Sequence, residues 1–234
     1  MLNIQHKKVE LGDTEIDEMG NDHVSSCYNT PLREDAFAKT DEEKIAEIAK
    51  QFEAIMQTLG LDLTDDSLKG TPQRVAKMYV KEVFQGLNPA NKPSISMFEN
   101  KYKYNEMLVE KNISFYTYCE HHFVPIMGIA HIAYLNNGQV IGLSKLNRIV
   151  DYFAKRPQVQ ERLTMQIGKE LENILGTSDV AVLIDAKHLC VASRGVKDNT
   201  STTITSYYSG IFQQAEKRDE FLKYLDINTN HSII

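Results

Sequence analysis

Two short clusters of cysteine and histidine place the strongest constraint on how this chain can fold. One is Cys119-Glu120-His121-His122, and the other, about 70 residues later, is His188-Leu189-Cys190. Thiolate and imidazole are the ligands that a zinc ion prefers. If both clusters bind one ion, the fold must bring these two distant segments together.

The spacing within each cluster is compatible with one shared metal site. Residues two apart on a strand point to the same face, so His188 and Cys190 are expected to face one site. Cys119 and His122, three apart across a turn, can both reach an ion. Three protein ligands would leave a fourth position open, as in catalytic zinc sites, where bound water has a pKa of roughly 7. The spacing alone does not decide which histidines bind metal and which are free to transfer protons.

A lone cysteine is more often a small buried hydrophobic residue than a ligand. Two clusters, each beside a predicted strand, favour the metal site over that simpler interpretation. The third cysteine, Cys27, lies in a polar segment with only His23 near it. We predict that it is a free thiol.

The periodicity predicts helices first and strands later. Residues 1–39 are polar and without a clear period, and Thr40–Glu43 has the pattern of a capping box that opens a helix ending near Gly60. Thr71-Pro72 is expected to cap and start a second helix, which Gly86 ends.

The remainder of the chain predicts an α+β fold, with an antiparallel sheet covered on one face by helices. Asn136-Asn137-Gly138 is a strong hairpin signal between two of the strands. Ser144 is expected to cap the next helix, Arg156-Pro157 to break it, and Gly176 to end the helix that follows. The predicted strands are 113–118, 126–135, 139–143, 180–184 continuing towards Cys190, and 202–212, and the final helix is 214–225.

Composition excludes several classes of protein. The net charge of −6 argues against a general nucleic-acid binder, which is usually basic. No apolar run reaches transmembrane length, and residues 1–10 include His6, Lys7 and Lys8 rather than a secretory apolar segment. Three cysteines do not form a disulfide framework. We therefore expect a reducing, cytoplasmic location and no membrane or nucleic-acid partner.

Cationic residues lie near both metal clusters in the predicted fold. Lys145 and Arg148 open a helix, where the backbone N–H groups already favour anions, and Arg194 and Lys197 follow Cys190 closely. Alone, such residues would be assigned to the solvated surface. Beside a metal site they suit a phosphorylated substrate.

The pair Gln160-Glu161 stands at the start of a predicted helix. A carboxylate there often only complements the helix dipole. A glutamate can also accept two N–H groups from a guanine edge, and periodicity does not choose between the two roles.

The chain resembles the GTP cyclohydrolase I family from about residue 41 to residue 225. Five blocks in family order carry the resemblance: Thr71–Ala76, Cys119–Pro125, Gly142–Arg148, Arg156–Thr164, and His188–Cys190 with Arg194–Val196. Five ordered blocks are more specific than any one motif.

The resemblance implies a role for each matching residue. Cys119, His122 and Cys190 would bind Zn²⁺, and His121 and His188 would move protons. The residues that would bind the substrate GTP are Gln160 and Glu161 at the guanine edge, and Ser144, Lys145, Arg148, Arg194 and, more weakly, Arg74 at the ribose and triphosphate. The implied reaction hydrates C8 of the purine, opens the imidazole ring, releases formate and closes the rearranged ribose to give 7,8-dihydroneopterin triphosphate, the first step of tetrahydrofolate and pterin biosynthesis.

The resemblance also implies a tunnelling fold. Each subunit would contribute a four-stranded antiparallel sheet, with helices on one face, to a β-barrel ring. The family assembles as a homodecamer of two stacked pentamers, with active sites between subunits. The chain would divide into a polar N-terminal arm (1–40), an N-terminal helical region (41–110) and a catalytic tunnelling-fold domain (111–234).

Two alternatives stay open from the sequence. A related tunnelling-fold nitrile reductase acting on a deazaguanine would use a nucleophilic cysteine and NADPH. The pair Cys119 and His122 together with Cys190 argues against it, and a measured content of one zinc ion per chain would favour the cyclohydrolase. A structural zinc or pterin-binding module without turnover would want a fourth protein ligand, which His121 or His188 could supply, and would lose its fold on chelation without consuming GTP.

Overall fold

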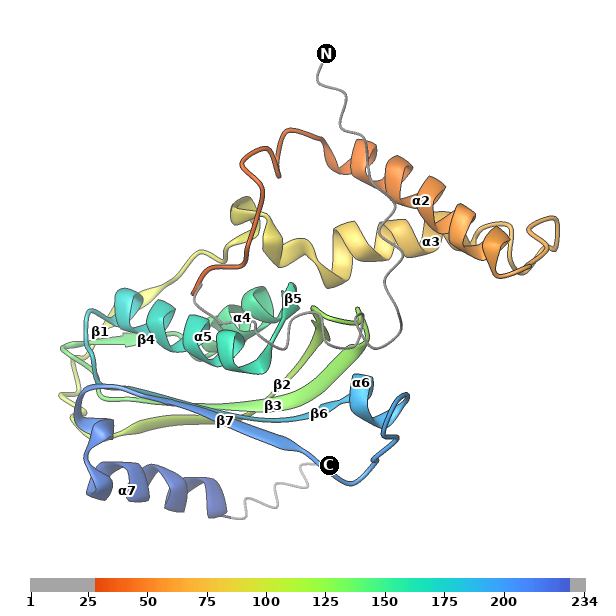
Figure 1. Ribbon diagram of the computed structural model, residues 1–234. Coiled ribbons are helices and arrows are strands. Elements are labelled where there is room, and N and C mark those ends of the chain that lie inside the picture. The colour runs from red at the N-terminus through yellow and green to blue at the C-terminus, as the bar shows by residue number, and fades with distance from the viewer. Residues whose placement is uncertain (1–27, 228–234) are drawn as a thin grey trace, which may run out of the picture.

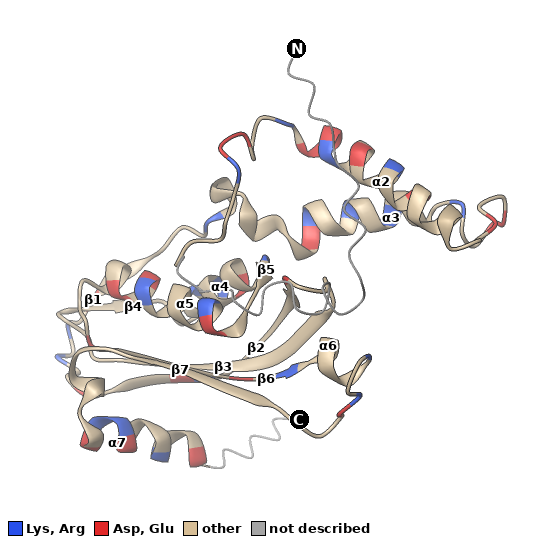
Figure 2. Cartoon of the chain, in the orientation of Figure 1, with Lys and Arg blue, Asp and Glu red and all other residues tan. Residues whose placement is uncertain are grey.

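The computed structural model describes residues 28–227, so Cys27, His23 and most of the predicted N-terminal arm lie outside the described residues. Two helices, α2 (Asp41–Thr58) and α3 (Thr71–Met78), form a pair that projects from one side of the sheet-containing part of the chain (Figure 1). A single π-helical turn, Tyr79–Val83, continues α3. Acidic and basic side chains are interspersed along α2 (Figure 2).

Local signals at the start of α2 act as predicted. The Glu43 N–H donates to the Thr40 hydroxyl at 3.2 Å, and the Thr40 N–H donates to the Glu43 carboxylate at 2.7 Å. This capping box is therefore confirmed. In α3 the cap is Gly70 rather than Thr71, which is already helical, with Pro72 in the first turn.

The main sheet has five strands in the order β5-β2-β3-β6-β7. The four longer strands are antiparallel neighbours: β2 (Leu108–Cys119), β3 (Pro125–Tyr134), β6 (Val180–His188) and β7 (Thr203–Tyr208). The fifth, β5 (Pro157–Gln158), is only two residues long and pairs in parallel with Tyr118 and Cys119. Four of the five predicted strands thus pair as antiparallel neighbours, but the sheet is a mixed one of five strands because β5 is parallel to β2.

The predicted hairpin after β3 is wrong. Strand β4 (Gln139–Ile141) pairs with a short strand, β1 (Met97–Glu99), in a separate two-stranded sheet. The reason is that Tyr134, at the end of β3, pairs with β2 on one side and β6 on the other. No free edge remains for a returning strand, although Gly138 does make the turn with φ +81°.

Helices cover both faces of the sheet rather than one. Helices α4 (Leu143–Ala154) and α5 (Gln160–Leu175) lie on one face above the main core (Figure 1). Helix α7 (Ala215–Asp226) lies on the other, where Phe212 and Phe221 cover Ala133 and Ala181. Alternate residues of a strand face opposite sides, so Ala133 and Ala181 belong to the face away from α4 and α5.

The bounds of two other elements, α4 and β7, differ from the predictions. Gly142, not Ser144, precedes the first residue of α4. Strand β7 stops at Tyr208 and a 3₁₀ turn, Gly210–Gln213, leads into α7. Helix α5 does end at Gly176, which takes the left-handed conformation with φ +62°. Among residues 28–227, no helix is both long enough and apolar enough to cross a bilayer.

Candidate active site

Three strand ends bring the two cysteine and histidine clusters together. Strand β3 lies between β2 and β6, and its residue Ile126 pairs with Thr117 on one side and with His188 on the other. The chain segments that leave β2 and β6 therefore meet at one end of the sheet. The ligand atoms of Cys119, His122 and Cys190 all lie within 4.8 Å of one another. The fold thus meets the constraint that the sequence imposed.

A tight turn presents the first two of these residues. The Cys119 N–H donates to the Val124 carbonyl at 2.9 Å, and the Phe123 N–H donates to the Cys119 carbonyl at 2.8 Å. Phe123 has a positive φ of 53°, which is uncommon for a residue with a side chain. Cys119 is buried at the end of the strand, whereas His122 is exposed.

The position of Cys190 differs from the prediction. Strand β6 ends at His188, and Cys190 lies on a one-turn helix, α6 (Leu189–Ala192). The two residues are therefore not side by side on one strand. The helical turn carries the Cys190 sulfur to Cys119, and His188 keeps its place at the strand end.

The three side chains fit a metal ion. The Cys119 sulfur lies 3.8 Å from His122 Nδ1. In a tetrahedral zinc site, bonds of about 2.3 Å to sulfur and 2.0 Å to nitrogen place ligand atoms about 3.5–3.8 Å apart. Burial and the neighbouring Cys119 raise the pKa of Cys190 to about 11. A bound cation would offset the cost of holding both sulfurs as thiolates.

His121 lies beside this group but is not one of its three members. Its Nδ1 is 3.7 Å from the Cys119 sulfur, and its Nε2 is 4.0 Å from a carboxylate oxygen of Glu120. The imidazole is more than half exposed, at 54% of its side-chain surface. It is therefore accessible to a substrate next to the metal-binding residues.

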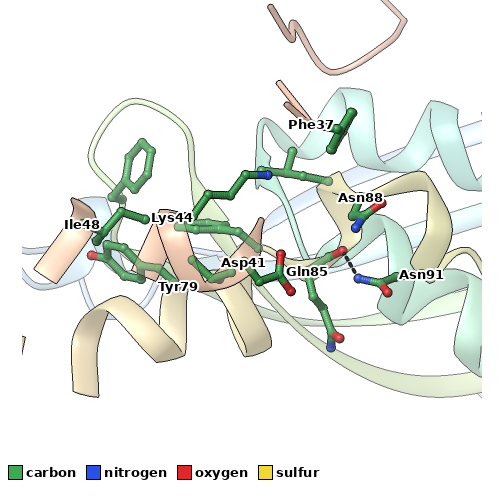
Figure 3. A pocket seen from close by; sticks show the side chains of 12 residues that line it. Phe37, Asp41, Lys44, Ile48, Tyr79, Gln85, Asn88 and Asn91 are labelled. Atoms are coloured by element: carbon green, nitrogen blue, oxygen red, sulfur yellow. Dashed lines mark hydrogen bonds between the residues drawn. The ribbon is translucent and has the colours of Figure 1, made fainter. Parts of the chain in front are cut away.

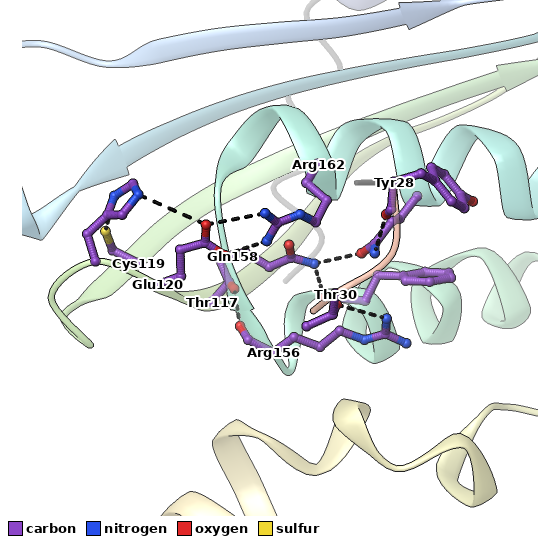
Figure 4. Close-up of polar contacts among 11 residues, drawn as sticks. Tyr28, Thr30, Thr117, Cys119, Glu120, Arg156, Gln158 and Arg162 are labelled. Atoms are coloured by element: carbon purple, nitrogen blue, oxygen red, sulfur yellow. Dashed lines mark hydrogen bonds and ion pairs between the residues drawn. The ribbon is translucent and has the colours of Figure 1, made fainter. Parts of the chain in front are cut away.

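A buried ion pair supports the same turn, and sequence reasoning missed it. Arg162, on the first turn of α5, binds both carboxylate oxygens of Glu120 (Figure 4). The Arg162 side chain is only 3% exposed. The available signal was an arginine beside Leu163 on the buried face of an amphipathic helix, because buried arginine is rare without a partner.

His188 is held by Gln160, the first residue of α5. His188 Nε2 lies 2.7 Å from the Gln160 side-chain oxygen. The Gln160 side-chain nitrogen lies 2.8 Å from the Thr203 carbonyl and 3.2 Å from the Ile184 carbonyl. Partial burial lowers the pKa of His188 below its ordinary value, an effect that Glu161 opposes.

The substrate-binding residues predicted from the resemblance fall into two groups. Glu161 and Arg194 are exposed near the metal-binding group, with Arg194 Nη1 2.7 Å from His122 Nε2. Ser144, Lys145 and Arg148 open α4, whose Asn147 donates to Glu110 near the start of β2 at 3.3 Å. Cys119 is at the other end of that strand, on the order of 25–30 Å away along an extended chain.

The hydrogen bonds of Arg74 stay within its own loop and helix. Its guanidinium donates to the Ser67 carbonyl at 2.9 Å and to the Thr71 hydroxyl at 3.0 Å, within the loop and first turn of α3. One chain therefore brings together Cys119, His121, His122, Gln160, Glu161, His188, Cys190 and Arg194. Ser144, Lys145 and Arg148 belong to the part of α4 that contacts the far end of β2, and the hydrogen bonds of Arg74 lie within its own loop and helix.

A pocket of about 380 Å³ separates α2 from the turns that follow α3 (Figure 3). Lys44 and Tyr79 line it, and so does Phe123, the residue after His122. The Phe123 ring lies 5.3 Å from the ring of Phe84, centre to centre, in an edge-on contact. The helical region thus packs directly on the turn that carries His122.

Known proteins match this chain over most of its length. The profile of the GTP cyclohydrolase I family matches residues 48–226. A protein named GTP cyclohydrolase 1 from Flavobacterium johnsoniae is 64% identical over 214 residues, covering 92% of this chain and 96% of its own. Proteins of the same name from Aeromonas salmonicida and Escherichia coli are 54% and 52% identical, over 82% and 86% of this chain and 88% and 90% of theirs.

Proposed function

The chain belongs to the GTP cyclohydrolase I family, and we infer that it hydrolyses the purine ring of GTP. The products are formate and 7,8-dihydroneopterin triphosphate, and the reaction is the first step of tetrahydrofolate and pterin biosynthesis. The group formed by Cys119, His122 and Cys190 is the observation that carries this conclusion to the residues of this chain. We place the reaction in the reducing cytoplasm, where thiolate ligands persist.

We propose that the metal is zinc. Two sulfurs and one imidazole match its ligand preference, and three protein ligands leave a position for substrate or water. When bound, zinc supplies Lewis acidity and lowers the pKa of a coordinated water to roughly 7. Cys119, His122 and Cys190 would hold it.

The other residues of the site have distinct proposed roles. His121 and His188 move protons to and from the purine, since both are histidines beside the metal-binding group. Glu161, exposed between two buried neighbours on α5, accepts the N–H groups of the guanine edge. This chemistry favours guanine because adenine lacks that pair of donors.

Arg194 binds the triphosphate. In the structure its guanidinium contacts His122 Nε2, and a guanidinium only donates. If His122 binds metal through Nδ1, its Nε2 carries the proton and no longer accepts. Arg194 would then turn from His122 towards a phosphate of the substrate.

We propose that a second copy of the chain completes the site. Asn147, between Lys145 and Arg148 on α4, contacts Glu110 at the far end of β2 from Cys119, so this part of α4 lies about a strand's length from the metal-binding group. Within residues 28–227, β7 has no strand partner on its outer edge, and β5 covers only the last two residues of β2, so both edges of the sheet are open to another copy. Edge-to-edge assembly into a barrel ring, as a decamer, closes these edges. Light scattering should then give a mass near ten times 26.7 kDa.

The direct test of the activity is incubation with GTP, with and without a strong chelator. We expect formate release and pterin fluorescence after oxidation, both lost on chelation and restored by Zn²⁺. Intact GTP with folded, metal-loaded protein would instead support a binding module without turnover. The Cys190→Ser variant should lose metal and both products.

A complementation test addresses the shared site. Cys119→Ser and the double variant Lys145→Ala/Arg148→Ala should each be inactive. Co-expressed in equal amounts, they should form mixed rings in which about a quarter of the shared sites are intact. Each half of a site comes, about half the time, from the chain in which that half is unchanged. Mixed rings without activity would contradict a site shared between chains.

A further inference from the structure

The first turn of α5 carries two adjacent residues with opposite environments. Glu161 is exposed, whereas Gln160 is 2% exposed and points into the sheet. We propose that Gln160 is a positioning residue, which accepts a hydrogen bond from His188 Nε2 and so fixes the orientation and the tautomer of that ring. This inference rests on the proposed function, in which His188 moves a proton.

The orientation of the Gln160 amide follows from its neighbours. The side-chain nitrogen faces three acceptors, the Thr203 carbonyl at 2.8 Å, the Thr205 hydroxyl at 3.1 Å and the Ile184 carbonyl at 3.2 Å. If the amide were turned over, its oxygen would face two carbonyl oxygens that cannot donate. The amide nitrogen therefore points to the carbonyls and the amide oxygen points away from them.

The amide oxygen in turn selects the form of the histidine. It lies 2.7 Å from His188 Nε2 and can only accept. Nε2 must therefore be the donor, in the neutral ring as well as in the imidazolium.

The surroundings hold the amide in place. The Thr164 hydroxyl donates to the Gln160 backbone carbonyl at 2.8 Å and lies 2.6 Å from the Thr205 hydroxyl. Thr164 is 1% exposed and Thr205 is half-buried, so the part of the network around the Gln160 amide is largely shielded from solvent. Because both ends of the Gln160 amide are already engaged inside the chain, the side chain acts on the substrate through His188 rather than by contacting guanine.

A double-variant cycle separates positioning from substrate binding. Gln160→Leu should lower kcat by about 10–100-fold, the usual cost of losing a group that orients an active-site histidine. The KM for GTP should stay within about twofold, because no substrate contact is lost. In a His188→Ala background the same change should cost almost nothing, since Gln160 then has no histidine to hold.

The matched control is Thr205→Val, which removes only one of the three acceptors around the amide nitrogen. Its kcat should stay within about threefold of the unaltered enzyme, because two carbonyl acceptors still fix the amide. Metal content and oligomer mass are measured for every variant. A KM raised tenfold with kcat unchanged in Gln160→Leu would make Gln160 a guanine-binding residue and overturn the inference. Equal losses with and without His188 would overturn it as well.

A spectroscopic measurement keeps the inference testable even if Gln160→Leu fails to fold. Nitrogen-15 spectra of the metal-loaded enzyme, labelled at histidine, distinguish Nε2–H from Nδ1–H, and His188→Ala identifies the signal. We expect Nε2–H at neutral pH, and a His188 protonated on Nδ1 alone would refute the inference. This spectrum does not depend on turnover, so it separates failure of the inference from failure of the proposed function.

Discussion

Replacing Arg162 by methionine tests whether the buried ion pair supports the metal-binding turn. The change removes a guanidinium that is 3% exposed and leaves the Glu120 carboxylate, 19% exposed, without its charged partner. Breaking a buried pair from one side costs about 3–5 kcal/mol. Because Glu120 keeps some contact with solvent, we expect the lower end of that range, about 3 kcal/mol.

For a subunit of this size, 1 kcal/mol corresponds to about 2–4 °C in Tm, so the Tm should fall by about 6–12 °C. The assay is thermal unfolding followed by circular dichroism, at fixed protein and metal concentrations. Both must be fixed because metal binding and oligomerisation raise the Tm by mass action. Activity should fall as well, since His121 loses the fixed carboxylate beside it.

Two control variants make this prediction specific. Adding Glu120→Gln to Arg162→Met removes the stranded charge and should recover more than half of the lost Tm. Lys69→Met breaks an exposed pair with Asp66 and should shift the Tm by less than about 2 °C. A fall of less than 2 °C in Arg162→Met, or no recovery in the double variant, would refute the reasoning.

Three further changes test other parts of the fold. Burial lowers the pKa of His131 below its usual value, and the Asn112 N–H donates to its Nδ1. The unfolded chain therefore takes up a proton more readily, and stability should fall as the pH drops below about 6.5. The fall in Tm from pH 7.5 to pH 5.5 should be smaller in His131→Gln, and an equal fall would contradict this assignment. Gly168→Ala would place a methyl group 2.2 Å from the Tyr207 ring, and chemical denaturation should show a loss of about 1–3 kcal/mol, whereas unchanged stability would mean that the ring can move aside. Thr40→Ala removes the α2 cap and should cost about 1 kcal/mol with activity retained; full stability would show that the capping box is dispensable.

The candidate site was predictable wherever chemistry is carried by residue type. The two cysteine and histidine clusters were identified as one metal site because thiolate and imidazole are the ligands that zinc prefers. The choice of Cys119, His122 and Cys190 among them came from the family resemblance, and the structure brings these three together. The Glu120–Arg162 pair was not predicted, since nothing in the sequence around Glu120 shows which of many basic residues faces it. The contact of Gln160 with His188 was missed for the same reason: it joins residues from different elements across the sheet.

Local sequence determined the start of α2, the break after α4 and the end of α5. The capping box at Thr40, the break before Pro157 and the left-handed Gly176 need only neighbouring residues to act. These are short-range effects of backbone sterics and side-chain hydrogen bonds, so they can be inferred from a few letters of sequence.

Tertiary structure alone decided which elements pair and what each polar group contacts. Strand β4 left β3 for β1 because β2 and β6 already occupied both edges of β3. Cys190 reached Cys119 from a helical turn rather than along a strand. In both cases the outcome depends on which residues, distant in sequence, come into contact. Those contacts form only when the whole sheet assembles, and the same packing sets the start of α4 apart from the metal-binding residues.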